Sequence, residues 1–295
     1  MRSTRTATLS GLLAILLWSS LALLTTATEG LPPFQVLALG FGFAALFGLL
    51  RTLPRGTAGW RELRQPWQAL ALTTIALFGY HALYFIALKH APAVEANLLN
   101  YLWPLLIVLF AALLPGVRVR GIQVVGTLLG LAGAVVLVTR GSSLAVDPRY
   151  LPGYLAALCA AVIWAAYSVL NRRHAAVASA AITVACVLVS LLGAGAHLAL
   201  EQTVAPTAMQ WAVLALMGLG PVGAAFLLWD HGTKHGDLAL LGSLSYLAPL
   251  LSTLLLVVAG KALPHWSQAL AIGLLLLGAW LSVRTPKPAR TRAPT

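Results

Sequence analysis

Long apolar runs, separated by short segments rich in proline, glycine and charged residues, follow one another along the whole chain. A helix that crosses the hydrocarbon core of a membrane needs about 20 largely apolar residues. The breakers between the runs favour loops or helix starts. The pattern predicts ten transmembrane helices, over residues 8–28, 33–50, 66–88, 93–114, 121–139, 152–170, 177–200, 208–229, 238–260 and 266–283.

The composition supports this interpretation and excludes a water-soluble globule. Of the 295 residues, 60% are hydrophobic and 9% are charged, whereas soluble domains carry about 25% charged residues. The alternation over about ten residues that is typical of membrane β-barrel strands is not visible. The predicted fold class is therefore an all-α polytopic membrane protein. Cys159 and Cys186 lie inside apolar runs, which indicates packing and not a disulfide framework.

The basic residues determine the predicted orientation. Fifteen of the 19 Lys and Arg residues fall on one side of the ten-helix arrangement, together with both chain ends. The positive-inside rule then predicts that the N- and C-termini are cytoplasmic. The net charge of +12 is explained by this bias, and the arginines are scattered over several loops, so no nucleic-acid partner is predicted. Lys89, Arg140, Arg149 and Lys261 form the outer minority.

The start of the chain allows one alternative. Residues 1–5 carry two arginines and precede an apolar run, as in a secretory signal peptide. A clear small-x-small cleavage site does not follow Leu24. We therefore interpret this segment as the first membrane helix.

The two halves of the sequence resemble each other at an offset of 145 residues. Lys89-His90 aligns with Lys234-His235, and the motif Tyr-Leu-x-Pro-Leu-Leu occurs at residues 101–106 and 246–251. One residue of slippage also aligns Trp18 with Trp164. Further matches are Gln123 with Gln268, and Gly133-Ala134 with Gly278-Ala279.

This repeat predicts the domain organisation. Residues 1–140 form a first unit of five helices, residues 141–284 a second unit, and residues 285–295 a basic cytoplasmic tail. Because five is odd, the second unit crosses the membrane upside down. Inverted repeats are typical of secondary transporters, in which the substrate site lies at the midplane between the halves and becomes accessible from alternate sides.

The chain resembles the drug/metabolite transporter superfamily, specifically its EamA-like type with ten helices. The resemblance rests on the first helix with Trp18, on the short connection Ala87–Ala93 and on the proline-bearing fourth and ninth helices. Residues 80–84 and 95–104 are similar to the corresponding stretches of YddG-type aromatic amino acid exporters. The resemblance implies export across the inner membrane through a basket-shaped bundle.

Polar and aromatic residues recur on one face of several predicted helices. In the fourth, sixth and ninth helices they stand at spacings of three, four and seven residues, which places them on one face. Polar groups in hydrocarbon are costly and usually face the bundle interior. We therefore predict a substrate-binding cavity formed by Tyr80, His81, Tyr84, Asn97, Asn100, Tyr101, Trp103, Trp164, Tyr167, Ser243, Ser245 and Tyr246.

Pro104 and Pro249 occupy equivalent positions in the two halves and are predicted hinges. A proline removes the amide that would bond to the carbonyl four residues earlier. The carbonyls of Asn100 and Ser245 are thus expected to be free, which is tolerated at membrane depth where the backbone lines a water-filled cavity. A buried kink between neighbouring helices is the alternative.

The predicted lining suits a zwitterion with an apolar or aromatic side chain. Rings stack offset or edge-on against Trp and Tyr, and amides and hydroxyls can bond the carboxylate and the ammonium group. A phosphorylated sugar would need Lys or Arg, and these residues lie at the predicted membrane edges. His81 has two interpretations, a proton relay or a neutral histidine that orients Tyr84 or the substrate.

Several ionisable residues lie near predicted helix ends. Glu95 begins the fourth helix, and Asp230 ends the eighth. His231, Lys234 and His235 lack the carboxylate–histidine spacing of a metal site, so we expect a solvated cytoplasmic loop there and no metal or other cofactor.

Three glycines of the fifth helix, Gly126, Gly130 and Gly133, form a small-residue seam. Such a seam allows two helices to pack closely. Contact with another helix of the same chain is its ordinary meaning, and a homodimer is the alternative.

Nucleophile–base constellations, phosphate-binding loops and metal motifs are missing from the sequence, so an enzyme is not predicted. The predicted function is that of an inner-membrane secondary transporter that exports neutral, preferably aromatic, amino acids by alternating access. Its partners are the small-molecule substrate and membrane lipid. The alternatives are an exporter of other small metabolites or drugs, and a non-transporting membrane scaffold.

Overall fold

The computed structural model describes residues 2–115, 117, 119–142 and 147–283. Every regular element in these residues is a helix, which confirms the predicted all-α class. Nine helical segments are long and apolar enough to cross a membrane, and Trp266–Ser282 is a shorter apolar helix. Together they account for the ten predicted spans.

The first half of the chain supplies five of these spans. The elements are α1 (Arg2–Ser19), α2 (Leu21–Thr26), α3 (Pro33–Thr52), η1 (Leu53–Arg55), α4 (Thr57–Leu63), α5 (Trp67–His90), α6 (Ala93–Asn100), α7 (Trp103–Ala111) and α8 (Gly121–Thr139).

The second half supplies the other five. The elements are η2 (Pro148–Tyr150), α9 (Leu151–Leu170), η3 (Asn171–His174), η4 (Ser179–Ala181), α10 (Ile182–Leu200), α11 (Ala208–Met217), η5 (Gly218–Ala224), α12 (Ala225–His235), α13 (Leu238–Leu244), α14 (Leu247–Val258) and α15 (Trp266–Val283).

Prolines and short polar side chains fix where many helices begin. Pro33 is the first residue of α3, and Pro66 and Pro92 directly precede α5 and α6. Proline suits these places because the first amides of a helix have no partner within it. Asp237 caps α13 by accepting a hydrogen bond from the backbone N–H of Leu240 at 3.0 Å.

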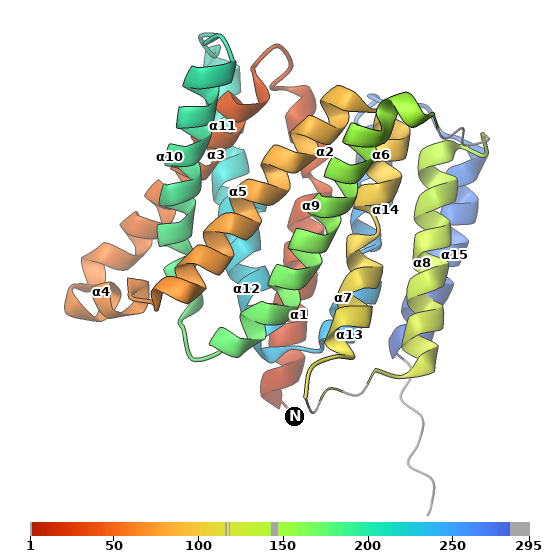
Figure 1. Ribbon diagram of the computed structural model, residues 1–295, viewed down its shortest axis with the longest axis horizontal. Helices are drawn as coiled ribbons and strands as arrows, with labels where there is room; N and C mark the ends of the chain where they lie inside the picture. Colours follow the sequence, from red (N-terminus) through yellow and green to blue (C-terminus); the bar gives the residue numbers. More distant parts are fainter. Residues whose placement is uncertain (1, 116, 118, 143–146, 284–295) are drawn as a thin grey trace, which may run out of the picture.

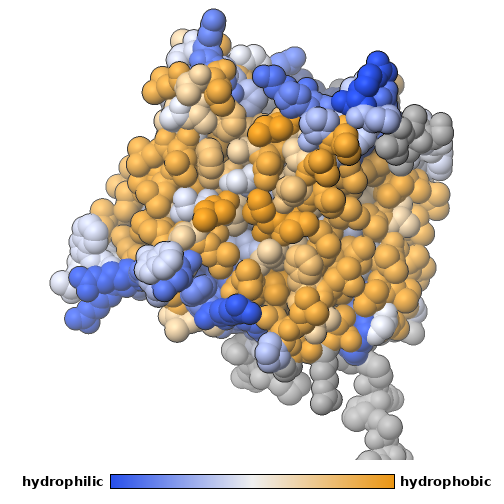
Figure 2. Space-filling view, in the orientation of Figure 1, coloured by the Kyte–Doolittle hydropathy of each residue, from blue (hydrophilic) through white to orange (hydrophobic). Residues whose placement is uncertain are grey.

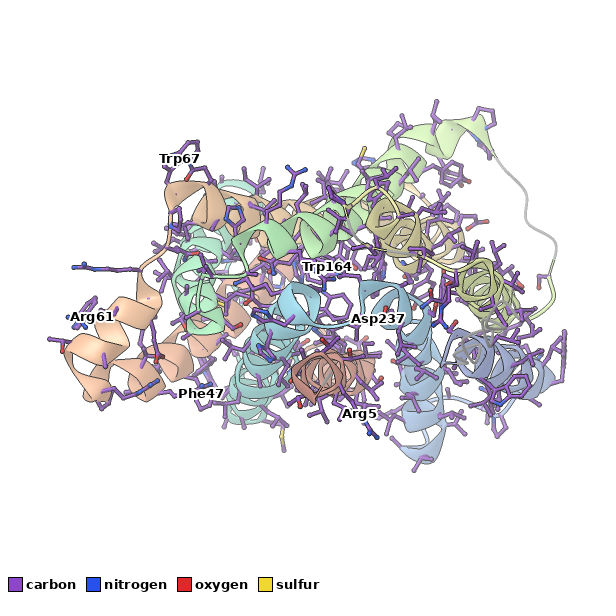
Figure 3. The ribbon with its side chains drawn as sticks, turned by 90° about the horizontal axis from the view of Figure 1, so that it is seen from below. Arg5, Phe47, Arg61, Trp67, Trp164 and Asp237 are labelled. Atoms are coloured by element: carbon purple, nitrogen blue, oxygen red, sulfur yellow. The ribbon has the colours of Figure 1, made fainter. Side chains whose placement is uncertain are left out.

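Figure 1 shows that the two halves cross the bundle in opposite directions. The helix α1 starts at the lower side, where the N-terminus is marked, whereas α9 starts at the upper side and runs downward. The helix α15 ends on the same side as the N-terminus. Seen from this side, Trp164 lies near the middle of the bundle, and Arg61 on α4 lies at its edge (Figure 3).

The main packing partners come from different halves. The helix α1 packs against α12, α3 against α10, α5 against α9, α7 against α13, and α8 against α15. Numbered by their order in each half, the first helix of one half therefore packs against the third of the other. The second, fourth and fifth helices pack against their own counterparts. This pattern is unchanged when the halves are exchanged.

The fourth and ninth spans are interrupted at equivalent places. The chain leaves helical geometry between α6 and α7 just before Pro104, and between α13 and α14 just before Pro249. The interruption does not leave the carbonyl of Ser245 free, as the sequence had suggested, because it accepts a hydrogen bond from the N–H of Ala248 at 3.1 Å. A tightened turn thus replaces the bond that Pro249 cannot make.

The eighth span contains a π-helical segment that the sequence pattern did not predict. Gly218–Ala224 forms this segment, with Pro221 inside it. Gly218 packs directly on α3, because a Cβ atom added there would lie 2.3 Å from Cβ of Phe43 and 2.8 Å from the carbonyl oxygen of Gly40. π-Helical turns are frequent at functional sites.

The glycines of the seam on α8 pack against other residues of the same chain. A Cβ atom at Gly126 would lie 2.4 Å from the carbonyl oxygen of Gly278 on α15, and one at Gly130 would lie 2.5 Å from the Tyr246 ring. Both glycines are buried. The seam therefore packs α8 against α15 and against Tyr246 of the same chain.

Apolar side chains cover the middle of the molecular surface. Figure 2 shows them as a broad belt, with hydrophilic residues gathered toward the two ends of the bundle. Residues such as Leu50, Leu113 and Leu198 are 65%, 81% and 77% exposed. Such exposure is expected of side chains that face lipid.

Candidate functional site

A cavity of about 470 Å³ lies inside the bundle, with walls from both halves. None of its described lining residues is Asp, Glu, Lys or Arg. The lining residues are Trp18, Leu21, Ala22, Thr25, Val36, Leu37, Gly40, Phe41, Tyr80, His81, Tyr84, Phe85, Leu88, Asn97, Asn100, Tyr101, Trp103, Trp164, Met217, Pro221, Val222, Phe226, Ala248, Pro249 and Ser252.

Aromatic rings form the base of the cavity. Trp18 contacts Trp164 edge-on, with ring centroids 5.7 Å apart, and contacts Trp229 at 5.1 Å. Trp103 contacts the same two rings at 6.5 and 6.0 Å. Phe226 closes the group from α12, 5.7 Å from Trp18. This base presents ring faces and edges to the cavity, which is the surface against which another aromatic ring packs.

Two hydrogen bonds between α5 and α6 form a polar wall. The Tyr84 hydroxyl donates to Oδ1 of Asn97 at 2.6 Å, and Nδ2 of Asn100 donates to the Tyr80 hydroxyl at 3.1 Å. The Tyr80 and Tyr84 rings are stacked, with centroids 6.1 Å apart and planes 7° apart. Because each tyrosine is joined to an amide, the four side chains are held as one unit. We call this unit the tyrosine–asparagine wall.

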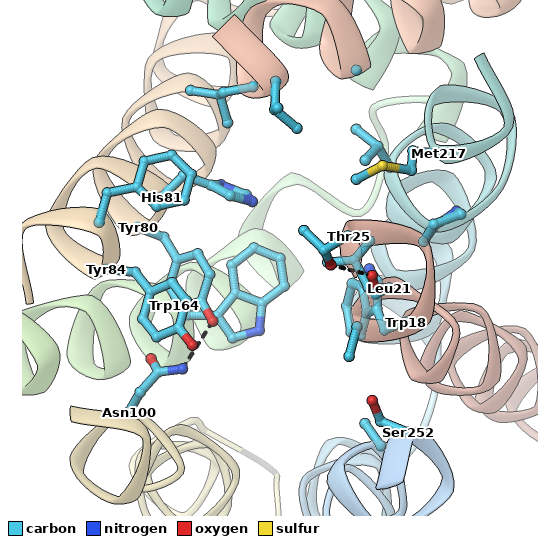
Figure 4. Close-up of a pocket in the computed structure, with 18 of the residues that line it drawn as sticks. Trp18, Leu21, Thr25, Tyr80, His81, Tyr84, Asn100, Trp164, Met217 and Ser252 are labelled. Carbon is cyan, nitrogen blue, oxygen red and sulfur yellow. Dashed lines mark hydrogen bonds between the residues drawn. The ribbon is translucent and has the colours of Figure 1, made fainter. Parts of the chain in front are cut away.

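His81 projects from α5 into the cavity, as Figure 4 shows. Its Nδ1 lies 2.6 Å from the carbonyl oxygen of Leu77. A carbonyl only accepts, so Nδ1 carries the hydrogen in this contact. The ring also packs edge-on against Phe41 and Tyr80, at 5.4 and 5.2 Å. This position keeps both sequence-based interpretations of His81 open, because the ring reaches the cavity.

Eight of the twelve predicted binding residues line the cavity, and the predicted hinge Pro249 lines it as well. Figure 4 shows Tyr80, Tyr84, Asn100 and Trp164 on one side of the space, across from Trp18 and Thr25. The predicted binding residues that line the cavity are Tyr80, His81, Tyr84, Asn97, Asn100, Tyr101, Trp103 and Trp164.

Four predicted binding residues are buried elsewhere, so the expectation that they line the cavity does not hold. Ser243 bonds to Thr127 of α8 at 2.6 Å, and Ser245 donates to the Leu241 carbonyl at 2.7 Å. The Tyr246 hydroxyl donates to the Tyr101 carbonyl at 3.0 Å. Tyr167 is 1% exposed in the core. Ser243 and Tyr246 face α8, where the Tyr246 ring lies against Gly130. Pro104 is also buried outside the lining.

Sequence reasoning missed one wall of the cavity. Trp18, Leu21, Ala22 and Thr25 line it at spacings of three, four and seven residues. This face of the first span is the counterpart, under the repeat, of the face that begins at Trp164. This face is mostly apolar, so the spacing of polar residues does not reveal it. Its alignment with the face of the sixth helix that begins at Trp164 would have identified it.

The eighth span corrects a second expectation. The helix α12 continues to His235, so His231, Lys234 and His235 lie in this helix and not in a solvated loop. Asp230 lies within the same helix and not at its end. Asp230 and Lys234 are 3% and 5% exposed, and Oδ2 of Asp230 lies 2.8 Å from Nζ of Lys234. Among the described residues, no group of three or more His, Cys, Asp or Glu could hold a metal ion.

The sequence matches the EamA-like transporter family over residues 5–139 and 151–284. The chain belongs to this family. The EamA-like fold places the protein among multi-pass transporters of the inner membrane and not among enzymes.

Relatives of this EamA-like protein cover nearly its full length. It is 50% identical over 278 residues to the aromatic amino acid exporter YddG of Ancylobacter novellus, which covers 94% of this chain and 96% of the relative. It is 30% identical to the aromatic amino acid exporter YddG of Escherichia coli, over 94% of this chain and 98% of that protein. A solved crystal structure with 49% sequence identity superposes with a TM-score of 0.90, over 95% of this chain and 96% of the other.

Proposed function

We propose that this protein exports neutral amino acids, preferably aromatic ones, from the cytoplasm. The observation that carries the proposal is the cavity, which combines an aromatic base, a tyrosine–asparagine wall and no Asp, Glu, Lys or Arg among its described lining residues. The 50% identity to a protein named as an aromatic amino acid exporter supports the same substrate class.

The two kinds of wall match the two parts of such a substrate. An aromatic side chain packs against Trp18, Trp103 and Trp164, and each favourable ring pair adds about 0.5–1.5 kcal/mol beyond the burial of area. The ammonium and carboxylate groups bond to the amides and hydroxyls of the tyrosine–asparagine wall. A net charged side chain would lose its hydration without a counter-ion in the lining, which disfavours acidic and basic amino acids.

The transport cycle we propose is alternating access between two inverted halves, residues 1–140 and 141–284. An offset of 146 residues relates Trp18, Ala22 and Thr25 of the first half to Trp164, Ser168 and Asn171 of the second. The first three line the cavity, as does Trp164 at its base. Farther along the same face, the counterparts Ser168 and Asn171 are outside the lining and are 0% and 2% exposed. Equivalent faces are thus open in one half and closed in the other, as expected of an inverted repeat caught in one of two states.

The orientation we propose puts both termini in the cytoplasm. It rests on the excess of Lys and Arg on the side where the chain begins. The open cavity extends along α2 and the end of α5, which lie at the opposite side of the bundle (Figure 1). In this orientation the cavity faces outward. The basic residues 285–295, predicted to form a cytoplasmic tail, lie outside the described residues.

The test is counterflow in liposomes that contain the purified protein. Vesicles loaded with unlabelled phenylalanine should accumulate external labelled phenylalanine transiently, and loading with unlabelled glutamate or lysine should not support accumulation. Absence of counterflow with every neutral amino acid would contradict the proposal. Counterflow only with non-amino-acid metabolites or drugs would favour the broader exporter function.

A further inference from the structure

A buried ion pair ties α12 to the cytoplasmic end of α9. Asp230 and Lys234 are joined at 2.8 Å, one helical turn apart. Oδ1 of Asp230 accepts from Nδ2 of Asn171 at 2.9 Å, and Nζ of Lys234 donates to the carbonyl of Val177 at 3.0 Å. Asn171 and Val177 belong to the segment that connects α9 to α10. The ion pair therefore joins the eighth span to the segment after the sixth.

Trp229 separates this ion pair from the cavity. It is 0% exposed, and its indole N–H donates to Oγ of Ser168 at 3.1 Å. Its ring packs against Trp164, 6.3 Å away and nearly parallel. The Trp229 ring thus lies beneath the aromatic base. The ion pair begins at the next residue, Asp230, and reaches one turn farther along α12, to Lys234.

In the part of the chain that the structure describes, the equivalent positions on the outer side hold no matching carboxylate. At the 145-residue offset, Trp229, Asp230 and Thr233 correspond to Tyr84, Phe85 and Leu88. All three counterparts line the open cavity. Asn171 corresponds to Thr25, on the opposite wall. If the outer side closed as the inner side is closed, Thr25 would meet Phe85 and Leu88, which offer no carboxylate.

We propose that Asp230, Lys234 and Asn171 form a one-sided latch that holds the cytoplasmic side closed. Burying two charges is costly, and removing one partner of such a pair is strongly destabilising for the arrangement that contains it. The latch is present only when the inner side is closed, so it favours the outward-facing state. The outer side closes through apolar and aromatic contacts alone. Opening the latch is then the step that admits substrate from the cytoplasm.

This inference rests on the alternating access proposed above. It adds that the outward-facing and inward-facing states differ in free energy, because the two repeats carry different side chains at the latch positions. A ligand or substitution can shift a two-state equilibrium only by its differential effect on the two states. Loss of the latch acts on the closed inner side alone, so it must increase the inward-facing population.

Two equivalent cysteine reporters can measure this shift, in a background with Cys159→Ala and Cys186→Ala. Ala22→Cys reports an open outer side, because Ala22 lines the cavity. Ser168→Cys occupies the counterpart position and is buried while the inner side is closed. Each is labelled with a membrane-impermeant maleimide, applied from the outer side for Ala22→Cys and from the cytoplasmic side for Ser168→Cys.

Asp230→Asn should increase cytoplasmic labelling of Ser168→Cys about tenfold and slow outer labelling of Ala22→Cys. Asn171→Ala should shift both rates in the same directions, and it carries the test if Asp230→Asn does not fold. The matched control is Lys89→Met, which changes the counterpart of Lys234 in the first half, where the residue is exposed. It should leave both rates unchanged.

Unchanged labelling in Asp230→Asn and Asn171→Ala would overturn the latch, as would an equal shift in Lys89→Met. The readout does not depend on the substrate. Phenylalanine counterflow by the unsubstituted protein, with unshifted labelling in the latch variants, would refute the latch and keep the proposed function. Shifted labelling without counterflow of any amino acid would support the latch and refute the substrate assignment.

Discussion

Trp18 and Trp164 meet edge to face at the base of the cavity, with ring centroids 5.7 Å apart and planes 72° apart. They occupy equivalent positions in the two halves of the sequence. Trp18 borders the open part of the cavity. Trp164 is 4% exposed and stacks on Trp229, which lies on the closed side. This contact lies where the open face of one half meets the closed face of the other.

Removing the Trp103 ring is expected to impair transport. Trp103 packs edge-on against Trp164 and Trp229 and also lines the cavity. A phenylalanine ring that packs against Trp103 would lose this contact, worth about 0.5–1.5 kcal/mol, which corresponds to about a two- to tenfold loss of phenylalanine affinity. Trp103→Ala should therefore raise the phenylalanine concentration needed for half-maximal counterflow.

The control for this variant is Trp60→Ala. Trp60 lies on α4 and is 59% exposed, away from the cavity. It should transport as the unsubstituted protein does. Equal transport by both variants, with the same elution on size-exclusion chromatography, would remove Trp103 from the site.

The tyrosine–asparagine wall is expected to act as a unit. Tyr84→Phe removes the hydroxyl that donates to Asn97, and Asn97→Ala removes the acceptor. Each should lower the rate of counterflow, because the remaining group loses its orientation. The double variant should be about as impaired as the worse single variant, since paired groups are not additive. Additive losses in the initial rates would show that the two side chains act independently.

Much of the fold could be predicted because hydrophobicity and proline positions are local signals. The sequence pattern predicted the spans, their order and the interruptions near Pro104 and Pro249. The π-helical segment Gly218–Ala224 was not, because it changes the backbone without changing the apolar character of the residues. It depends on the close approach of Gly218 to α3, which no local pattern specifies.

The polar wall of the site was also predictable, whereas the neighbours that the polar face of the ninth span meets were not. Spacing assigned Asn97 and Asn100 to one face, and that face meets the cavity. The same spacing assigned Ser245 and Tyr246 to one face, but periodicity does not say which neighbour a face meets. Tyr246 packs toward α8 and the Tyr101 carbonyl instead. His231, Lys234 and His235 were predicted to lie in a solvated loop because they are polar and follow an apolar run, but α12 continues to His235.

The packing of α8 against α15 makes a prediction about stability. A Cβ atom at Gly278 would lie 2.4 Å from the carbonyl oxygen of Gly126, a backbone atom that cannot move aside alone. Gly278→Ala should therefore destabilise the protein by about 1–3 kcal/mol through overpacking. Thermal unfolding in detergent measures this change.

Gly273→Ala is the matched control on the same helix. Nothing lies within 4 Å of a Cβ atom added there. In an open helical position alanine is favoured over glycine by about 1 kcal/mol, so Gly273→Ala should equal or exceed the unsubstituted protein in unfolding temperature. A lower unfolding temperature for Gly273→Ala than for Gly278→Ala would contradict the packing described for this pair of helices.

The orientation can be tested with residues at opposite ends of the bundle. Arg61 on α4 is predicted to face the cytoplasm, and Lys261 after α14 is predicted to face outward. In a background with Cys159→Ala and Cys186→Ala, an impermeant maleimide added to intact cells should label Lys261→Cys and not Arg61→Cys. Both should react in permeabilised cells. Labelling of Arg61→Cys in intact cells would place the termini on the outer side.

Blocking the cavity itself tests the central claim most directly. Ser252 lines the cavity opposite Asn100 (Figure 4), and Leu200, at the end of α10, is 73% exposed outside it. Phenylalanine counterflow would be measured for Ser252→Cys and Leu200→Cys, in a background with Cys159→Ala and Cys186→Ala, before and after reaction with a bulky maleimide. We predict that the modified Ser252→Cys protein loses counterflow and that the modified Leu200→Cys protein keeps it. Undiminished counterflow through fully modified Ser252→Cys would contradict transport through this cavity.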